Sequence, residues 1–396
     1  AIGISSGISG VALAAGPLLG GVLIQISGWQ AIFFVNLPIG IAVLISGMNL
    51  LAESRNPAAH RLDIGGQILA IAGLTALTYA LIEGNAQGWG SLLIVGLFVA
   101  AGVLLAAFVV VEARADEPML PLGFFKNASF SVANAVALVV GFALLGTVFF
   151  ISQYFQGVQG FVPLASGLRS LPNTMGIFVA APIAGALAAR LGPRVPITLG
   201  ALCSGTALLL LMRLGPATPY AAIWWNLGLG GIGFGLMLSP LAAAVLGALP
   251  PTRSGLASSM INMSRQVGGV FGVALLGALV QGQYASNIAN GLTQHGIPSQ
   301  ISQSIANAIA GAGIQAGKVL GRQHLPLPTT TLHALANQSF TDALHGAFLV
   351  AGLALLVSAA ASAFLLGRRQ PSVAANPEAT AESQPPEAMP AVAEIA

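Results

Sequence analysis

The sequence predicts an all-α, polytopic membrane protein, and three observations lead to that fold class. Of the 396 residues, 56% are hydrophobic and only 6% are charged, whereas soluble domains carry about 25% charged residues. The mean hydropathy is +0.86. The apolar residues gather in ten stretches of about 20 residues, the length that an α-helix needs to cross a bilayer. Lipid is therefore the expected solvent for most of the chain.

The ten apolar stretches follow one another along the chain as far as residue 366. Each is expected to be a helix, because a helix satisfies its own backbone hydrogen bonds in lipid. The third stretch has the least distinct end, since Glu83 and Asn85 follow it closely. The predicted spans are Ile2–Ile26, Ile32–Leu51, Ile64–Leu81, Leu92–Val111, Phe130–Phe150, Leu164–Ala189, Val195–Met212, Ala221–Leu249, Gly255–Val280 and Ala343–Leu366.

Arginine and lysine residues in the connections predict the side that each connection faces. The first, third and fifth connections lack them, whereas the second, fourth, sixth and eighth connections and the C-terminal tail carry them. The positive-inside rule places the latter group in the cytoplasm. We therefore expect a multi-pass protein of the inner (plasma) membrane with a cytoplasmic C-terminus. The chain starts at Ala1 inside an apolar run, so upstream sequence with an even number of further spans is expected.

Two segments lack the composition of a membrane span. Residues 283–341 are rich in Gln, Asn, Ser and Thr and are expected to form an extracytoplasmic loop. Within them, "ISQSIANAIAGAGIQAGKVL" spaces its apolar residues like an amphipathic helix, which we expect to lie on the outer membrane surface. Residues 367–396 are rich in Pro, Ala and Glu, and this composition is typical of a disordered tail.

The first span contains residues that weaken a helix in water, namely Gly10, Gly16, Pro17, Gly20 and Gly21. In lipid, small residues instead let helices approach one another closely, and this packing replaces the hydrophobic force. The glycines are expected to form a smooth packing face, and Pro17 is expected to bend the span.

The same residues resemble a known family. The run "GPLLGG" is similar to the antiporter motif on the fifth helix of the major facilitator superfamily. The runs "GWQAIFFVNLPIG", "LDIGGQILAIAGLTALTYAL" and "QYFQGVQGFVPLASGLRSLPNTMG" resemble later parts of its fourteen-helix drug:proton antiporter branch. The resemblance implies the major facilitator fold, in which the ten spans are helices five to fourteen. It implies that residues 1–51 end the N-terminal bundle, 52–127 hold two extra central helices, and 128–366 form the C-terminal six-helix bundle.

Polar residues at membrane depth are the candidate functional residues, because they are costly in lipid unless they face a cavity or a neighbouring helix. For Asn134 and Asn226, cavity lining and interhelical hydrogen bonding remain equally open. Gln156 and Asn173 lie in stretches that match the family, which favours cavity lining, and Arg169 could extend to the outer interface. The full set of candidates for the cavity or for proton coupling is Asn134, Gln153, Gln156, Arg169, Asn173, Asn226, Asn262 and Arg265.

Arg265 is the most informative of these candidates. It follows Arg253 by twelve residues, which is about 18 Å along a straight helix. No Asp or Glu lies inside the spans of the second bundle to neutralise it. Two interpretations remain open. Arg265 is a functional charge that faces either water or a partner in the missing helices, or it is an interfacial anchor on a helix that begins later than Gly255.

The function expected from these features is transport rather than catalysis. The sequence shows no phosphate loop, nucleophile motif or histidine spacing for a metal, so no cofactor or metal is expected. The resemblance implies alternating-access export of small lipophilic or cationic compounds in exchange for protons. The alternatives are a fourteen-helix exporter of a specific metabolite or siderophore, and an inactive or regulatory membrane remnant. The expected partners are the substrate, protons and the bilayer, without nucleic acid; the sequence identifies no periplasmic adaptor.

Overall fold

The structure of the chain is a computed structural model that describes residue 16 and residues 19–50, 63–115, 118, 120, 122–249, 254–312 and 327–367. The secondary structure of these residues is helical, with no strand among them. Within the described ranges, nine helices are long and apolar enough to cross a membrane. The all-α, polytopic membrane class is thus confirmed. The first predicted span lies mostly outside these ranges, which contain its helical residues 16 and 19–26. The tail beyond residue 367 lies outside as well.

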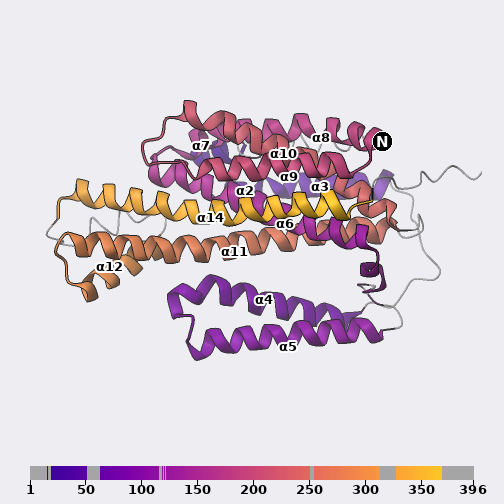
Figure 1. Cartoon of the computed structure of the whole chain (residues 1–396), viewed down its shortest axis with the longest axis horizontal. Coiled ribbons are helices and arrows are strands. Elements are labelled where there is room, and N and C mark those ends of the chain that lie inside the picture. The colour runs from indigo at the N-terminus through magenta and orange to yellow at the C-terminus, as the bar shows by residue number, and fades with distance from the viewer. Residues whose placement is uncertain are drawn as a thin grey trace, which may run out of the picture.

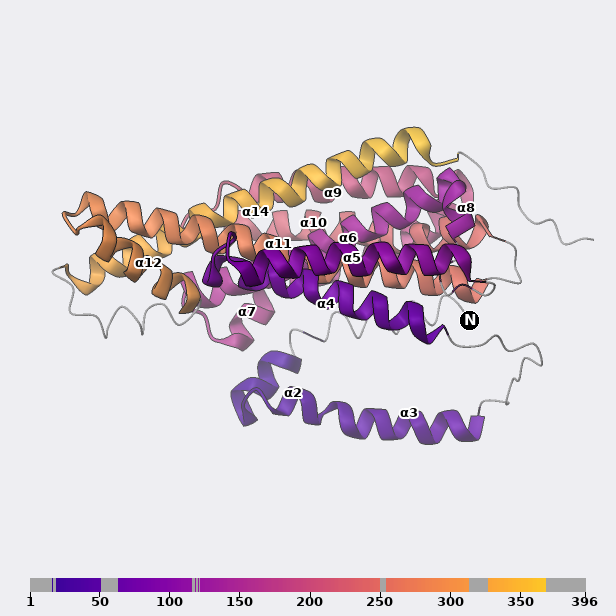
Figure 2. The same cartoon turned by 90° about the horizontal axis from the view of Figure 1, so that it is seen from below.

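The first described helices belong to two separate pairs. A short helix α2 (Ala31–Phe34) precedes α3 (Asn36–Leu50), which has no buried residue; Figure 2 shows both apart from the other helices. Helices α4 (Ile64–Gln87) and α5 (Leu92–Arg114) form an antiparallel hairpin that packs along α11 (Ser254–Gln294) (Figure 1). Asp63 caps α4 by accepting a hydrogen bond from the Gly66 amide at 2.8 Å, which satisfies one of the unpaired amides of a helix start.

The remaining membrane helices form one packed bundle with a continuous apolar core. Within it, α8 packs on α10, α6 on α11, and α9 on both α10 and α14. A short 3₁₀ helix, η1 (Leu122–Lys126), leads from the α4–α5 hairpin into the bundle. The bundle consists of α6 (Ala128–Gln153), α7 (Pro163–Arg169), α8 (Leu171–Leu191), α9 (Arg194–Leu211), α10 (Tyr220–Gly247), α11 and α14 (Thr329–Leu365).

Glycines allow the bundle helices to approach closely. A Cβ atom added at Gly268 or Gly272 of α11 would collide with the backbone of α6, and one added at Gly176 of α8 would lie 2.7 Å from the carbonyl oxygen of Gly228 in α10. Backbone atoms cannot move aside as a flexible side chain can. Close packing of this kind is what holds helices together in lipid, and it accounts for glycines that would be costly in a water-exposed helix.

The sixth predicted span, Leu164–Ala189, is two helices rather than one. Helices α7 and α8 meet at Ser170. In an uninterrupted helix, Pro172 would lack an amide hydrogen and its ring would clash with the carbonyl of Leu168, four residues earlier. The helix therefore breaks just before Pro172. Helix α8 starts with this proline in its first turn, where the lack of an amide hydrogen costs least.

The ninth and tenth helices are longer than the predicted spans. Helix α11 continues past Val280 to Gln294, and α14 begins at Thr329 rather than at Ala343. The two extensions pack on each other, with the rings of Tyr284 and Phe340 at 5.4 Å. Hydropathy identifies only the apolar part of each helix. The polar extensions stay helical because they pack on each other. Residues 283–341 are thus not a loop throughout.

Helix α12 (Ser299–Ala312) lies against the extension of α11 at one end of the molecule (Figure 1). The prediction of an amphipathic helix is confirmed for these residues. Its expected place at the outer membrane surface stays a prediction. Ile305 and Ala306 of α12 are buried in the protein core, whereas Ile301 is exposed.

Candidate functional site

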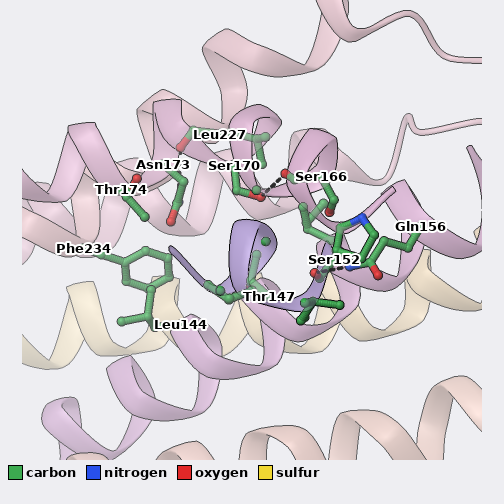
Figure 3. Close-up of a pocket in the computed structure, with 17 residues that line it drawn as sticks. Leu144, Thr147, Ser152, Gln156, Ser166, Ser170, Asn173, Thr174, Leu227 and Phe234 are labelled. Atoms are coloured by element: carbon green, nitrogen blue, oxygen red, sulfur yellow. Dashed lines mark hydrogen bonds between the residues drawn. The ribbon is translucent and has the colours of Figure 1, made fainter. Parts of the chain in front are cut away.

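A cavity of about 260 Å³ lies between the helical residues 19–27 and the bundle. Helices α6, α7, α8 and α10 supply most of its wall. Figure 3 shows Leu144 and Phe234 close together at one end of it, and Ser152 and Gln156 at the other. The apolar part of the wall is formed by Ile24, Leu144, Val148, Ile151, Leu227 and Phe234.

The polar part of the wall is made of neutral hydroxyls and carboxamides. Within the described residues, no charged side chain lines the cavity, and no cluster of three His, Cys, Asp or Glu could hold a metal. Two of these polar groups, Gln156 and Asn173, are among the candidates predicted from the sequence, whereas the five hydroxyls are not. Three of the missed residues recur every four positions, a spacing that places them on one helical face. The polar residues are Thr147, Ser152, Gln156, Ser166, Ser170, Asn173 and Thr174.

A short π-helix, η2 (Tyr154–Val158), extends α6 beyond its predicted end and carries Gln156. Hydrogen bonds to the loop before α10 hold η2 in place. The Tyr154 hydroxyl donates to the Gly215 carbonyl at 2.7 Å, and Gln159 Nε2 lies 3.0 Å from the Tyr154 hydroxyl oxygen. Gln156 Nε2 donates to Ser152 Oγ at 3.1 Å. Single π-helical turns occur often at functional sites, and this one sets the polar end of the cavity.

The segment 19–27 approaches α7 closely at Gly21. A Cβ atom added there would lie 2.7 Å from Leu164 Cα and 3.2 Å from the Pro163 carbonyl oxygen. By contrast, Cβ atoms added at Gly16 or Gly20 would meet nothing within 4 Å among the described residues. The close contact expected for the glycine face is therefore found at Gly21. Gly10 and Pro17 lie outside the described residues.

Arg169, at the end of α7, is held by aromatic rings. Its guanidinium carbon lies 3.5 Å from the centre of the Phe161 ring and 5.7 Å from that of Tyr220. Arg169 Nη1 donates to the Ala165 carbonyl at 3.2 Å, and the Tyr220 hydroxyl donates to the Arg169 carbonyl at 3.1 Å. These contacts join α7 to α10, and the interfacial position considered from the sequence stays a prediction.

The three asparagines of the bundle interior have different surroundings. Asn134 Oδ1 accepts a hydrogen bond from Ser264 Oγ at 3.1 Å, which joins α6 to α11 and fits the interhelical interpretation. Asn173 lines the cavity and also donates to the Leu227 carbonyl at 3.2 Å. Asn226 is buried away from the cavity wall, and its Oδ1 has no hydrogen-bond partner within the described ranges.

Arg265 lies on α11 and does not line this cavity. Helix α11 begins at Ser254, so Arg265 lies eleven residues further on, about 16 Å along the helix axis. A helix that begins later than Gly255 is thus not observed. Arg265 is half-buried, and its Nη2 donates to Asn262 Oδ1 at 2.8 Å. Asn262 is exposed. Gln153 does not line this cavity but a second one.

Comparison with known proteins adds the family context. The model of the Major Facilitator Superfamily matches residues 1–273. The multidrug resistance protein Stp of Mycobacterium tuberculosis is 33% identical over 361 residues, 90% of this chain and 66% of that protein. The tetracenomycin C resistance and export protein of Streptomyces glaucescens is 32% identical over 372 residues, 92% and 68% respectively. The puromycin resistance protein pur8 of Streptomyces alboniger is 36% identical over 300 residues, 73% and 58%. The chain thus spans about two thirds of the length of the first two relatives.

Proposed function

This chain belongs to the major facilitator superfamily, and from that membership we propose that it acts in a secondary transporter that exports small lipophilic compounds in exchange for protons. The names of its relatives, which are resistance and export proteins for antibiotics, support drug export as the task. The proposed location is the inner membrane with a cytoplasmic C-terminus, supported by the distribution of Arg and Lys in the connections.

The cavity between residues 19–27 and the bundle is the observation that carries this proposal. Pockets for small molecules are mostly apolar and contain a few polar groups that fix orientation, and this wall has that composition. Since its described part lacks charge, it favours uncharged lipophilic substrates over the cations that the sequence left equally open. A cation here would find no carboxylate among the described lining residues to offset its desolvation.

Alternating access gives the Gly21 contact a role. In a major facilitator transporter, two bundles rock around a site near the membrane midplane. The contact of Gly21 with Leu164 closes one side of the cavity between a first-bundle helix and α7. We propose that Gly21 and Leu164 separate in the step that opens the cavity to the outside. Arg265, half-buried and hydrogen-bonded to Asn262, is the proposed coupling group on the cytoplasmic side of α11.

Inverted membrane vesicles with an acidic lumen test this proposal. An uncharged lipophilic dye should accumulate in them, because protons leaving the lumen drive the dye inward. Gly20→Leu, which extends into the cavity where a Cβ meets nothing, should block the accumulation. Arg265→Ala should insert normally and lose the dependence on the gradient, whereas Arg265→Lys keeps part of it. The matched control is Gly102→Leu on α5, where an added Cβ also meets nothing.

The proposal fails if both variants, inserted at the wild-type level, accumulate the dye as fast as the control. Loss with Gly20→Leu alone would retain the cavity as the substrate site and remove Arg265 from the coupling mechanism. Loss in the Gly102→Leu control would mean that the assay reports membrane insertion rather than occupation of the cavity.

A further inference from the structure

A second cavity, of about 270 Å³, lies where the extra hairpin meets the bundle. Its wall comes from α4, α6, α11 and α14, and it shares no lining residue with the first cavity. The hairpin is tied to the bundle at the edge of this cavity, because Asn85 Nδ2 of α4 donates to the Ala278 carbonyl of α11 at 2.6 Å. The lining residues are Ile82, Phe149, Phe150, Gln153, Val273, Ala274, Gly277, Ala278, Val280, Gln281, Tyr284 and Phe340.

Aromatic rings and an opening toward the lipid characterise this wall. Phe149 and Phe150 meet edge to face with their centres at 5.1 Å, and Tyr284 and Phe340 do so at 5.4 Å. The inner rings, Phe150 and Tyr284, are 2% and 4% exposed, whereas Phe149 and Ile82 at the rim are 44% and 53% exposed. The outer surface of spanning helices faces lipid, so a ligand would enter from the bilayer.

Two carboxamides in the wall have no hydrogen-bond partner within the part of the chain that the structure describes. The side chains of Gln153 and Gln281 are half-buried and line the cavity. The described residues offer neither of them a hydrogen bond. The nearby amide of Asn85 is satisfied on both sides, since its Oδ1 accepts from Trp89 Nε1 at 2.9 Å while its Nδ2 binds Ala278. A carboxamide at membrane depth is costly without a partner, so the two glutamines are available to a ligand.

The composition of the wall selects among membrane-dissolved ligands. None of the described residues that line the cavity is charged, which disfavours a cation or an anion. A phospholipid acyl chain would fit the apolar surface but would leave both glutamines unpaired. A flat ring system packs against aromatic side chains, and one donor or acceptor on it can pair with a glutamine.

We propose that this cavity is an accessory binding site for a flat, uncharged aromatic amphiphile that arrives from the bilayer. The site requires the extra hairpin, because α4 closes one side of it. It shares no lining residue with the first cavity, and its existence does not depend on the transport function proposed above.

Binding of N-phenylnaphthylamine to the chain in lipid nanodiscs tests the proposal. This uncharged aromatic amine becomes fluorescent in apolar sites, and the signal of empty nanodiscs is subtracted. Gly277→Leu should remove one saturable component, because a Cβ added at Gly277 meets only Phe150 Cζ at 4.0 Å and the longer side chain fills the cavity. Gly102→Leu on the lipid-facing side of α5 is the matched control and should keep the component.

Gln281→Leu tests the hydrogen bond to the ligand without filling the cavity. It leaves the volume of the cavity nearly unchanged, and loss of one hydrogen bond should weaken binding about tenfold. Gly20→Leu, which fills the first cavity, should leave this component unchanged. The unfolding midpoint of each variant shows that it is folded.

Two results would overturn the proposal. One is an unchanged binding component in both folded variants, Gly277→Leu and Gln281→Leu. The other is a phospholipid that co-purifies at one molecule per protein and is lost in Gly277→Leu while dye binding is retained, which would assign the cavity to a lipid chain.

Discussion

A methyl group added at Gly21 should hold the first cavity open toward the outside. In the structure, the new Cβ would lie 2.7 Å from Leu164 Cα and 3.1 Å from Leu164 N. Carbon atoms pack at about 3.5 Å or more, so the segment 19–27 and α7 must separate by about 0.8 Å. Both colliding atoms are backbone, and no rotation of a side chain can relieve the overlap.

The energetic cost falls on the closed arrangement alone, because the contact is absent once the two elements separate. Overpacking of this kind costs about 1–3 kcal/mol. Each 1.4 kcal/mol is a factor of about ten in an equilibrium constant, so Gly21→Ala should raise the ratio of outward-open to closed protein by about 5-fold to 150-fold. The matched control is Gly20→Ala, which adds the same methyl group at the neighbouring residue. There the new Cβ meets nothing within 4 Å among the described residues.

The assay is labelling of a cysteine at Ser170, in the cavity wall, by an impermeant thiol reagent added to intact cells. The background carries Cys203→Ser, since Cys203 is the one cysteine of the chain. Gly21→Ala should increase the labelling rate at least about fivefold when the closed form dominates, whereas Gly20→Ala should not change it. Equal rates in the two variants would show that Gly21 does not close the outer side of the cavity.

Two further predictions concern the contacts that hold α7 and α6 in place. Arg169→Lys should lower the thermal unfolding midpoint of the purified protein nearly as much as Arg169→Gln, because the flat guanidinium packed on Phe161, rather than the charge, makes the contact; a wild-type midpoint in Arg169→Lys would refute this. Asn134→Ala and Ser264→Ala should be non-additive in a double-mutant cycle of unfolding, with a coupling of about 0.6 kcal/mol, and strict additivity would mean that their hydrogen bond contributes nothing.

The sequence predicted those parts of the fold that depend on composition over about 20 residues. The predicted span Leu92–Val111 corresponds to α5, Leu92–Arg114, and Val195–Met212 corresponds to α9, Arg194–Leu211. A window of apolar residues captures burial in lipid well. It cannot show where a helix continues beyond the apolar stretch, as α11 does to Gln294, because there the helix is held by packing with α14.

The candidate site was predictable only in part, for a related reason. Carboxamides stand out in an apolar span, and so Gln156 and Asn173 were found. Hydroxyls do not stand out, since Ser and Thr can satisfy themselves on the carbonyl of their own helix, as Ser170 does on Ser166 at 3.1 Å. The four-residue recurrence of Ser166, Ser170 and Thr174 was present in the sequence. The helix break at Ser170 divides this recurrence between α7 and α8, so a single predicted span does not reveal it.

Helix α6 explains how two cavities arise in one bundle. Thr147, Ile151 and Ser152 face the first cavity, while Phe150 and Gln153 face the second. A residue and the next one along an α-helix point about 100° apart, so a single helix can line both cavities with neighbouring residues. Beyond Gln153, Gln156 of the π-helical turn lies about one turn after Ser152 and again lines the first cavity. Any rotation of α6 that reshapes one cavity must therefore move the aromatic and amide groups of the other.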